Sequence, residues 1–195
     1  ELSDTLADFI SLIPAQITVL EVNKQLFRNV LGVKSLKDFK GSKERREMPD
    51  FPYRVMSSMH FKFFADYLEK NNAIGQIICD SRRGADHHLL NTLNLCKEGH
   101  VPYFDELAST KIKKRVTAIC FGEKNFLSGG LEITDLISFV SFFRVRRLIT
   151  ANQHIGIDKI WSNLSERIKI LEVGEKPIQN FFGLKKGEVH KYLKT

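Results

Sequence analysis

The stretch AIGQIICDSRRGADHHLLNTLNLCKEGH, residues 73–100, sets the fold class. Its first eight residues form a short apolar run that ends on Asp80, which is typical of a buried strand. Residues 81–100 indicate a turn followed by an amphipathic helix with a glycine near its end. A second apolar run, RVTAICFGEK at 115–124, predicts another buried strand. A strand, a helix and a further strand predict an α/β fold with a parallel or mixed sheet covered by helices.

Segments on both sides continue this alternation. Apolar residues at helical spacing predict four further helices, which we place at 1–13, 51–72, 129–147 and 157–171. The β-branched run QITVLEVN predicts a strand over 16–23. The basic stretch 34–50 lacks apolar periodicity, and we expect a mobile loop there. We expect the strands that end near Asn23 and Asp80 to be neighbours in one sheet, with helix 52–70 packed across it.

The composition indicates a chain with a substantial hydrophobic core and an excess of basic over acidic residues. Of its 195 residues, 43% are hydrophobic and 27% are charged, which is ordinary for a globular protein. We expect a domain over 1–170 and a basic tail over 171–195. The 30 basic and 23 acidic side chains give a net charge of +7, which favours polyanionic partners such as nucleic acid. Because no segment has the roughly 18 uncharged apolar residues of a membrane span, we expect no membrane partner.

The three cysteines exclude two classes of stabilising site. Cys79, Cys96 and Cys120 form no C-x-x-C pair and are odd in number. A disulfide framework and a structural zinc site are therefore not expected, and a reducing cytoplasm is the predicted compartment.

Four acids stand where predicted strands end or predicted helices begin. Asp80 ends a strand, Asp86 enters the next helix, and Glu132 and Asp135 lie early in GLEITDLISF, residues 130–139. The plain explanation is structural, because an acid caps a turn or suits the positive end of a helix. The functional explanation is a shared cation, because neighbouring carboxylates repel each other and Mg²⁺ prefers oxygen ligands. Such an ion can activate water against a phosphodiester. On these residues alone both explanations stay open.

Basic residues accompany these acids. Arg82 and Arg83 follow Asp80, Lys124 follows the second buried strand, and Arg144 lies two to three turns beyond Asp135. Such groups can hold a nucleic-acid backbone without reading its sequence, although arginines at a helix end also suit its dipole. The run KIKKR, residues 111–115, is expected in a loop, as solvated charge.

Four stretches together resemble a known family. They are VLEVNK (19–24), PYRVMSSMHFKFFADYL (52–68), IICDSRRGAD (77–86) and GLEITDLISF (130–139). In order and spacing they are similar to the family called domain of unknown function 3800. Its members carry an aspartate-plus-arginine motif after a strand and a later pattern resembling G-L-Q-L-A-D-L-I. The resemblance covers about residues 1–147.

The resemblance implies a ribonuclease H-like fold, in which acids come from the first strand, the end of the fourth strand and a later helix. Asp80 matches the fourth-strand acid, Asp135 the helix acid and Lys24 a lysine just after the third strand. Glu132 stands where the family usually has glutamine. The D-E-S-G of the family's first strand has no counterpart here, and the resemblance therefore implies that the first hairpin is missing from this chain, supplied elsewhere or lost.

The resulting hypothesis is a nuclease that binds Mg²⁺ or Mn²⁺ through Asp80 and Asp135, whose carboxyl groups should then lie within about 6–7 Å of each other. Glu132 and Asp86 would be auxiliary acids. The expected phosphate contacts are Arg82, Arg83, Lys124, Arg144 and Lys24. The alternative is a non-catalytic interaction or nucleic-acid-binding protein that keeps the fold with an incomplete acidic site. A protein partner or a homo-oligomer is compatible with both.

Overall fold

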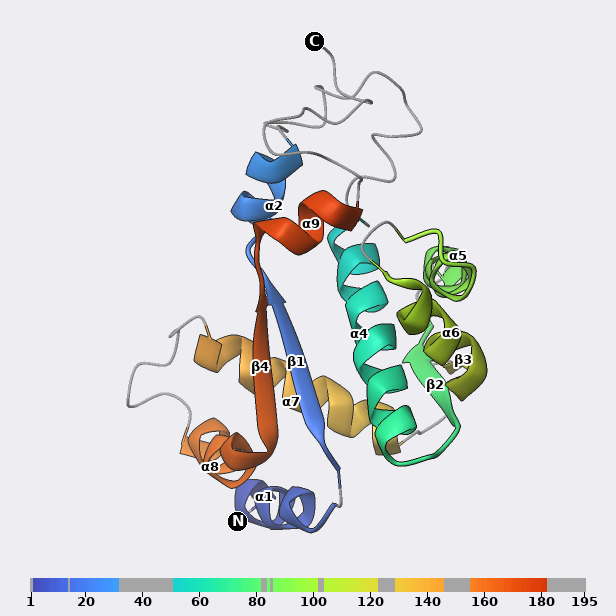
Figure 1. Cartoon of the computed structure of the whole chain (residues 1–195). Coiled ribbons are helices and arrows are strands. Elements are labelled where there is room, and N and C mark those ends of the chain that lie inside the picture. Colours follow the sequence, from blue (N-terminus) through green and yellow to red (C-terminus); the bar gives the residue numbers. More distant parts are fainter. Residues whose placement is uncertain are drawn as a thin grey trace. The chain divides into compact units, whose positions relative to one another are not determined.

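The computed structural model describes the parts of the chain that carry most of the predicted elements (Figure 1). The described residues are 2–13, 15–31, 51–81, 84, 86–101, 104–122, 129–145 and 155–181. The loop expected over 34–50 lies outside them.

Helices and strands alternate along the described chain, which confirms the expected α/β class. The helices are α1 (Leu2–Leu12), α2 (Lys24–Leu31), α4 (Phe51–Lys70), α5 (Asp86–Lys97), α6 (Glu106–Arg115), α7 (Gly129–Val145), α8 (Ile155–Leu164), the short 3-10 helix η3 (Ser165–Arg167) and α9 (Glu175–Phe181). The strands are β1 (Ile17–Val22), β2 (Gly75–Asp80), β3 (Val116–Gly122) and β4 (Ile168–Val173).

The strands form two separate pairs among the described residues. β2 lies parallel to β3, with Ile77 opposite Ile119, and β1 pairs with β4. The expectation that the strands ending near Asn23 and Asp80 are neighbours is therefore wrong. The error comes from β4. The apolar spacing predicts that residues 168–171 end a helix, but the helix ends before them. They form instead the strand that pairs with β1.

The chain divides into two compact units. The first contains residues 1–19 and 123–171, and the second contains 20–122 and 172–195. Residues 171–173 complete β4, and α9 packs against α2, each helix burying one large side chain, Ile178 and Phe27. The division into a domain and a tail at residue 170 stays a prediction.

The core of the first unit is made by α1, α7 and α8. Its most buried side chains are Ile10, Val140, Ile160 and Leu164. The helical apolar spacing that predicted α1 thus places Ile10 in the core, whereas Phe9 on the same helix is 54% exposed.

Arg167, in η3, closes the carboxyl end of α1. Its guanidinium donates hydrogen bonds to the backbone oxygens of Ile10 at 3.3 Å, Ser11 at 3.0 Å and Ala15 at 3.0 Å, and also to that of Ile13. The last carbonyls of a helix have no partner within the helix. Because arginine presents several donors in one plane, a single side chain can serve them all.

The core of the second unit lies between one face of the β2–β3 pair and the helices α4, α5 and α6. Its buried residues are Phe61, Ala65, Leu68, Leu89, Leu93, Cys96, Val101, Phe104, Ala108, Ile112 and Val116. Gly75 begins β2 against α4, and a Cβ placed there would lie 2.7 Å from the Phe64 ring and 3.0 Å from a Leu68 methyl. Glycine at this position lets the strand start close to the helix.

The run KIKKR forms the second half of α6, so the expected loop over residues 111–115 is wrong. The run has no apolar stripe of its own, but the helix begins upstream, where the Asp105 carboxylate accepts a hydrogen bond from the Ala108 backbone N–H at 2.7 Å. Ile112 is then fully buried in the core. Capping and one buried side chain outweigh the polar composition.

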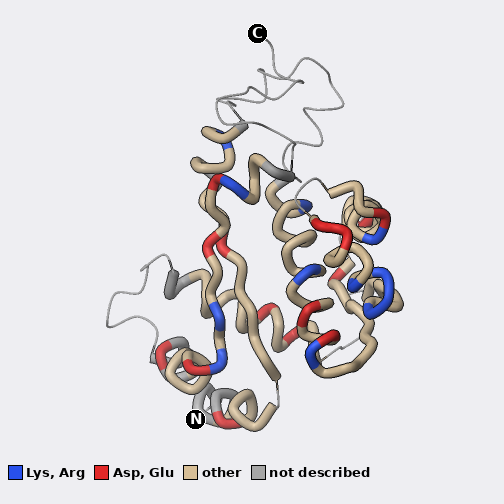
Figure 2. Tube along the Cα trace, in the orientation of Figure 1, with Lys and Arg blue, Asp and Glu red and all other residues tan. Residues whose placement is uncertain are grey.

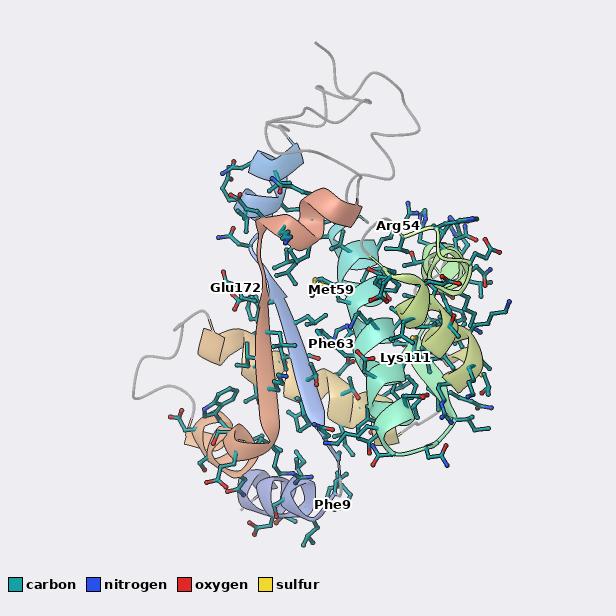
Figure 3. The ribbon with its side chains drawn as sticks, in the orientation of Figure 1. Phe9, Arg54, Met59, Phe63, Lys111 and Glu172 are labelled. Atoms are coloured by element: carbon teal, nitrogen blue, oxygen red, sulfur yellow. The ribbon has the colours of Figure 1, made fainter. Side chains whose placement is uncertain are left out.

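Ion pairs join α6 to α4 beside this core. Lys111 lies between the two helices (Figure 3), with its Nζ 2.8 Å from the Asp66 carboxylate. Lys62 approaches the same carboxylate at 2.9 Å. Arg115 donates to Glu69 at 2.5 Å and to the Ala73 carbonyl at 3.3 Å. The basic end of α6 is therefore partly neutralised by α4.

Replacing Arg167 with Met should lower the free energy of unfolding by about 2 kcal/mol, because several carbonyls lose a charged donor. Arg167→Lys should recover only part of this, since lysine lacks the planar fork. Lys169→Met, at an exposed position of β4, is the matched control and should change stability by less than about 0.5 kcal/mol. Urea denaturation measures all three. Equal losses for Arg167→Met and Lys169→Met would contradict the role of Arg167.

Acidification should weaken the tie between α4 and α6. Burial alone would raise the pKa of Asp66, but hydrogen bonds and charges from Lys111 and Lys62 outweigh it and hold the pKa below its ordinary value of 3.8. A lowered carboxyl pKa gives stability that is present above pH 3.8 and is lost as the pH falls through the folded-state pKa.

Asp66→Asn should therefore be less stable than wild type at pH 7, by up to about 1 kcal/mol for such a partly exposed pair. The difference should shrink below pH 3.8. Urea unfolding across this pH range measures it, with the exposed Asp8→Asn as the control. A difference that is independent of pH would show that the ion pairs contribute no charge-dependent stability.

Candidate functional site

The carboxyl ends of β2 and β3 lie together at one edge of the parallel pair. Asp80, the last residue of β2, is in register with Gly122, the last residue of β3. The Ser81 backbone N–H donates to the Gly122 carbonyl at 2.9 Å, which continues the pairing by one residue. In α/β sheets, ligands bind beyond this edge. Asp80 therefore stands where the sequence places it, at the edge where a site would form.

Asp86 reaches the same edge from the start of α5. The Ser81 hydroxyl donates a hydrogen bond to the Asp86 carboxylate at 2.7 Å, across the turn between strand and helix. Both residues are half-buried. Ser81 was not among the predicted site residues. The signal for it is a hydroxyl directly after the strand and five residues before an acid that begins a helix.

Asp80 and Asp86 share this edge, and the alternation of side chains along β2 assigns Asp80 to one face of the strand pair. Side chains alternate along a strand, and Cys79 packs against the core formed with α4, α5 and α6. Asp80 therefore belongs to the opposite face, together with Ile78, whose side chain is 62% exposed. Asp86 is held at the same edge by the hydrogen bond from the Ser81 hydroxyl.

Cys79 and Cys96 are held in their protonated form. Burial, with the charge of Asp86 as a second cause, raises the pKa of the Cys79 thiol to about 11. Burial raises the pKa of Cys96 to about 12. Both are free thiols, and so is the exposed Cys120 on β3. Since a thiol binds metal or attacks a substrate as the thiolate, Cys79 suits packing rather than chemistry at this edge.

Glu132 and Asp135 lie on α7, in the first unit. Both side chains are exposed, while Leu136 and Val140 of the same helix pack into the core of that unit. Glu132 is in the first turn, where an acid suits the helix dipole. Asp80 belongs to the second unit and Asp135 to the first. The expected approach of these two carboxylates stays a prediction.

The predicted phosphate contacts fall largely outside the described part of the chain. Arg82, Arg83 and Lys124 are outside it. Lys24 begins α2 and Arg144 lies near the end of α7, but their side chains are not described. Among the described basic residues, those of α6 form a visible group (Figure 2). Lys111 and Arg115 are engaged by α4, whereas Lys113 and Lys114 are exposed.

Neither the described residues nor the comparisons with known proteins identify a molecule or ion that binds at this edge. In the ranges that the structure describes, no three His, Cys, Asp or Glu residues are grouped so that they could hold a metal ion. None of the described helices is long and apolar enough to cross a membrane. No family model, no curated protein and no solved structure matches the chain.

Thiol labelling should report the two faces of the β2–β3 pair. At pH 8 a thiol with a pKa of about 11 is only about one-thousandth ionised, so Cys79 should react slowly, and the buried Cys96 likewise. Cys120, on the exposed side, should react fastest of the three. Native protein should thus show one fast thiol with a disulfide reagent, and unfolded protein three.

Cys120→Ser should abolish the fast phase, while Cys79→Ser should leave it unchanged. A second fast thiol that is lost in Cys79→Ser would place Cys79 on an accessible face and would contradict its packing against the core.

Proposed function

We propose that the protein is a metal-dependent nuclease, which hydrolyses phosphodiester bonds of nucleic acid on a ribonuclease H-like α/β domain. One observation carries the proposal: Asp80 ends a strand of a parallel pair, directly beside the end of its neighbour at Gly122. Polar groups beyond the carboxyl ends of parallel strands are where ligands bind in open α/β sheets, and this supports the proposal. The resemblance of residues 77–86 and 130–139 to a ribonuclease H-like family points to the same acid.

The donor chemistry at this edge fits Mg²⁺ or Mn²⁺. Mg²⁺ takes few carboxylates from a protein and completes its shell with water and substrate phosphates. Asp80 is the proposed direct ligand here, and Asp135 is the second ligand that the resemblance implies. A bound ion of this kind would supply an activated water and stabilise the leaving oxygen.

The other acids have supporting roles in this proposal. Asp86, which accepts a hydrogen bond from the Ser81 hydroxyl at 2.7 Å, would accept hydrogen bonds from metal-bound water rather than bind the ion directly. Glu132 is a second auxiliary acid, one turn before Asp135. Additional negative charge near a bound divalent ion strengthens the attraction of the site for that ion.

Nucleic acid is the proposed substrate because of the charge of the chain. The net charge of +7 favours a polyanion, and Arg82 and Arg83 follow the proposed ligand directly in the sequence. Lys24, Lys124 and Arg144 are the further proposed phosphate contacts. Contacts of this kind position a backbone without reading bases. Three free thiols fit a reducing compartment, and we propose the cytoplasm.

A second candidate is a non-catalytic nucleic-acid-binding or interaction protein. One observation favours it: among the described residues, β1 pairs with β4 rather than with β2, which differs from the single sheet that we expected. Such a protein would keep the basic balance and the strand edge but would not depend on a divalent ion.

Asp80→Asn should reduce Mg²⁺-dependent cleavage by at least about 100-fold, because even outer-shell partners of a metal cost 10–100-fold when they are lost. The substitution keeps the size of the side chain and removes its charge, so the fold should remain. Asp8→Asn, an exposed acid of α1, removes the same charge elsewhere and should leave cleavage unchanged. Cleavage of labelled single-stranded DNA and RNA, with Mg²⁺ or with EDTA, measures this.

A melting curve with and without Mg²⁺ separates the two candidates. Wild type should melt at a higher temperature with Mg²⁺, and Asp80→Asn should lose this shift. Unchanged cleavage in Asp80→Asn would remove Asp80 from the site. A wild type that binds nucleic acid without cleavage, and without any Mg²⁺-dependent shift, would establish the non-catalytic protein.

A further inference from the structure

We draw no further inference here: the strongest candidate, the exposed apolar face of the β2–β3 pair around Ile78 and Cys120, is a sheet face without a partner among the described residues, and nothing in the structure shows what covers it.

Discussion

The parallel pairing of β2 with β3 is the constraint on which the second unit depends. Parallel neighbours cannot be joined by a tight turn, so the chain must return along a crossover, and α5 and α6 are that crossover. Their apolar sides and that of α4 then bury one face of the pair, with Val116 at the start of β3 fully enclosed. The same pairing brings Asp80 beside Gly122. Core and candidate site therefore follow from one ladder of hydrogen bonds.

Several charged side chains of this protein form contacts that stabilise the fold. Lys111 and Arg115 form ion pairs with Asp66 and Glu69. Two of the four basic residues in the run KIKKR therefore join α6 to α4. In the first unit, Arg167 is likewise engaged by the carbonyls at the end of α1. These contacts leave the net charge of +7 unchanged, but they make the paired basic groups less available for direct contact with a partner.

The sequence pattern predicted those helices and strands whose limits are set by neighbouring residues. β2, β3 and α5 were predicted because apolar runs and a glycine stop mark their limits, and Asp80 and Asp86 were placed correctly at strand end and helix start. β4 was missed, because residues 168–171 follow a helix without a proline or glycine break, and β1, its partner, is distant in sequence. That Asp80 belongs to the exposed face of the pair, opposite Cys79, depends on the exact strand register, which an apolar run does not fix.

The central claim is a divalent-ion site at the carboxyl edge of β2 and β3. Paramagnetic Mn²⁺ broadens the NMR signals of nuclei close to it, so substoichiometric Mn²⁺ added to ¹⁵N-labelled protein locates the ion directly. The account predicts that the amide signals of Asp80, Ser81 and Gly122 broaden first and recover when excess Mg²⁺ displaces the Mn²⁺. Broadening centred on other acids, or spread evenly over the surface and insensitive to Mg²⁺, would contradict it.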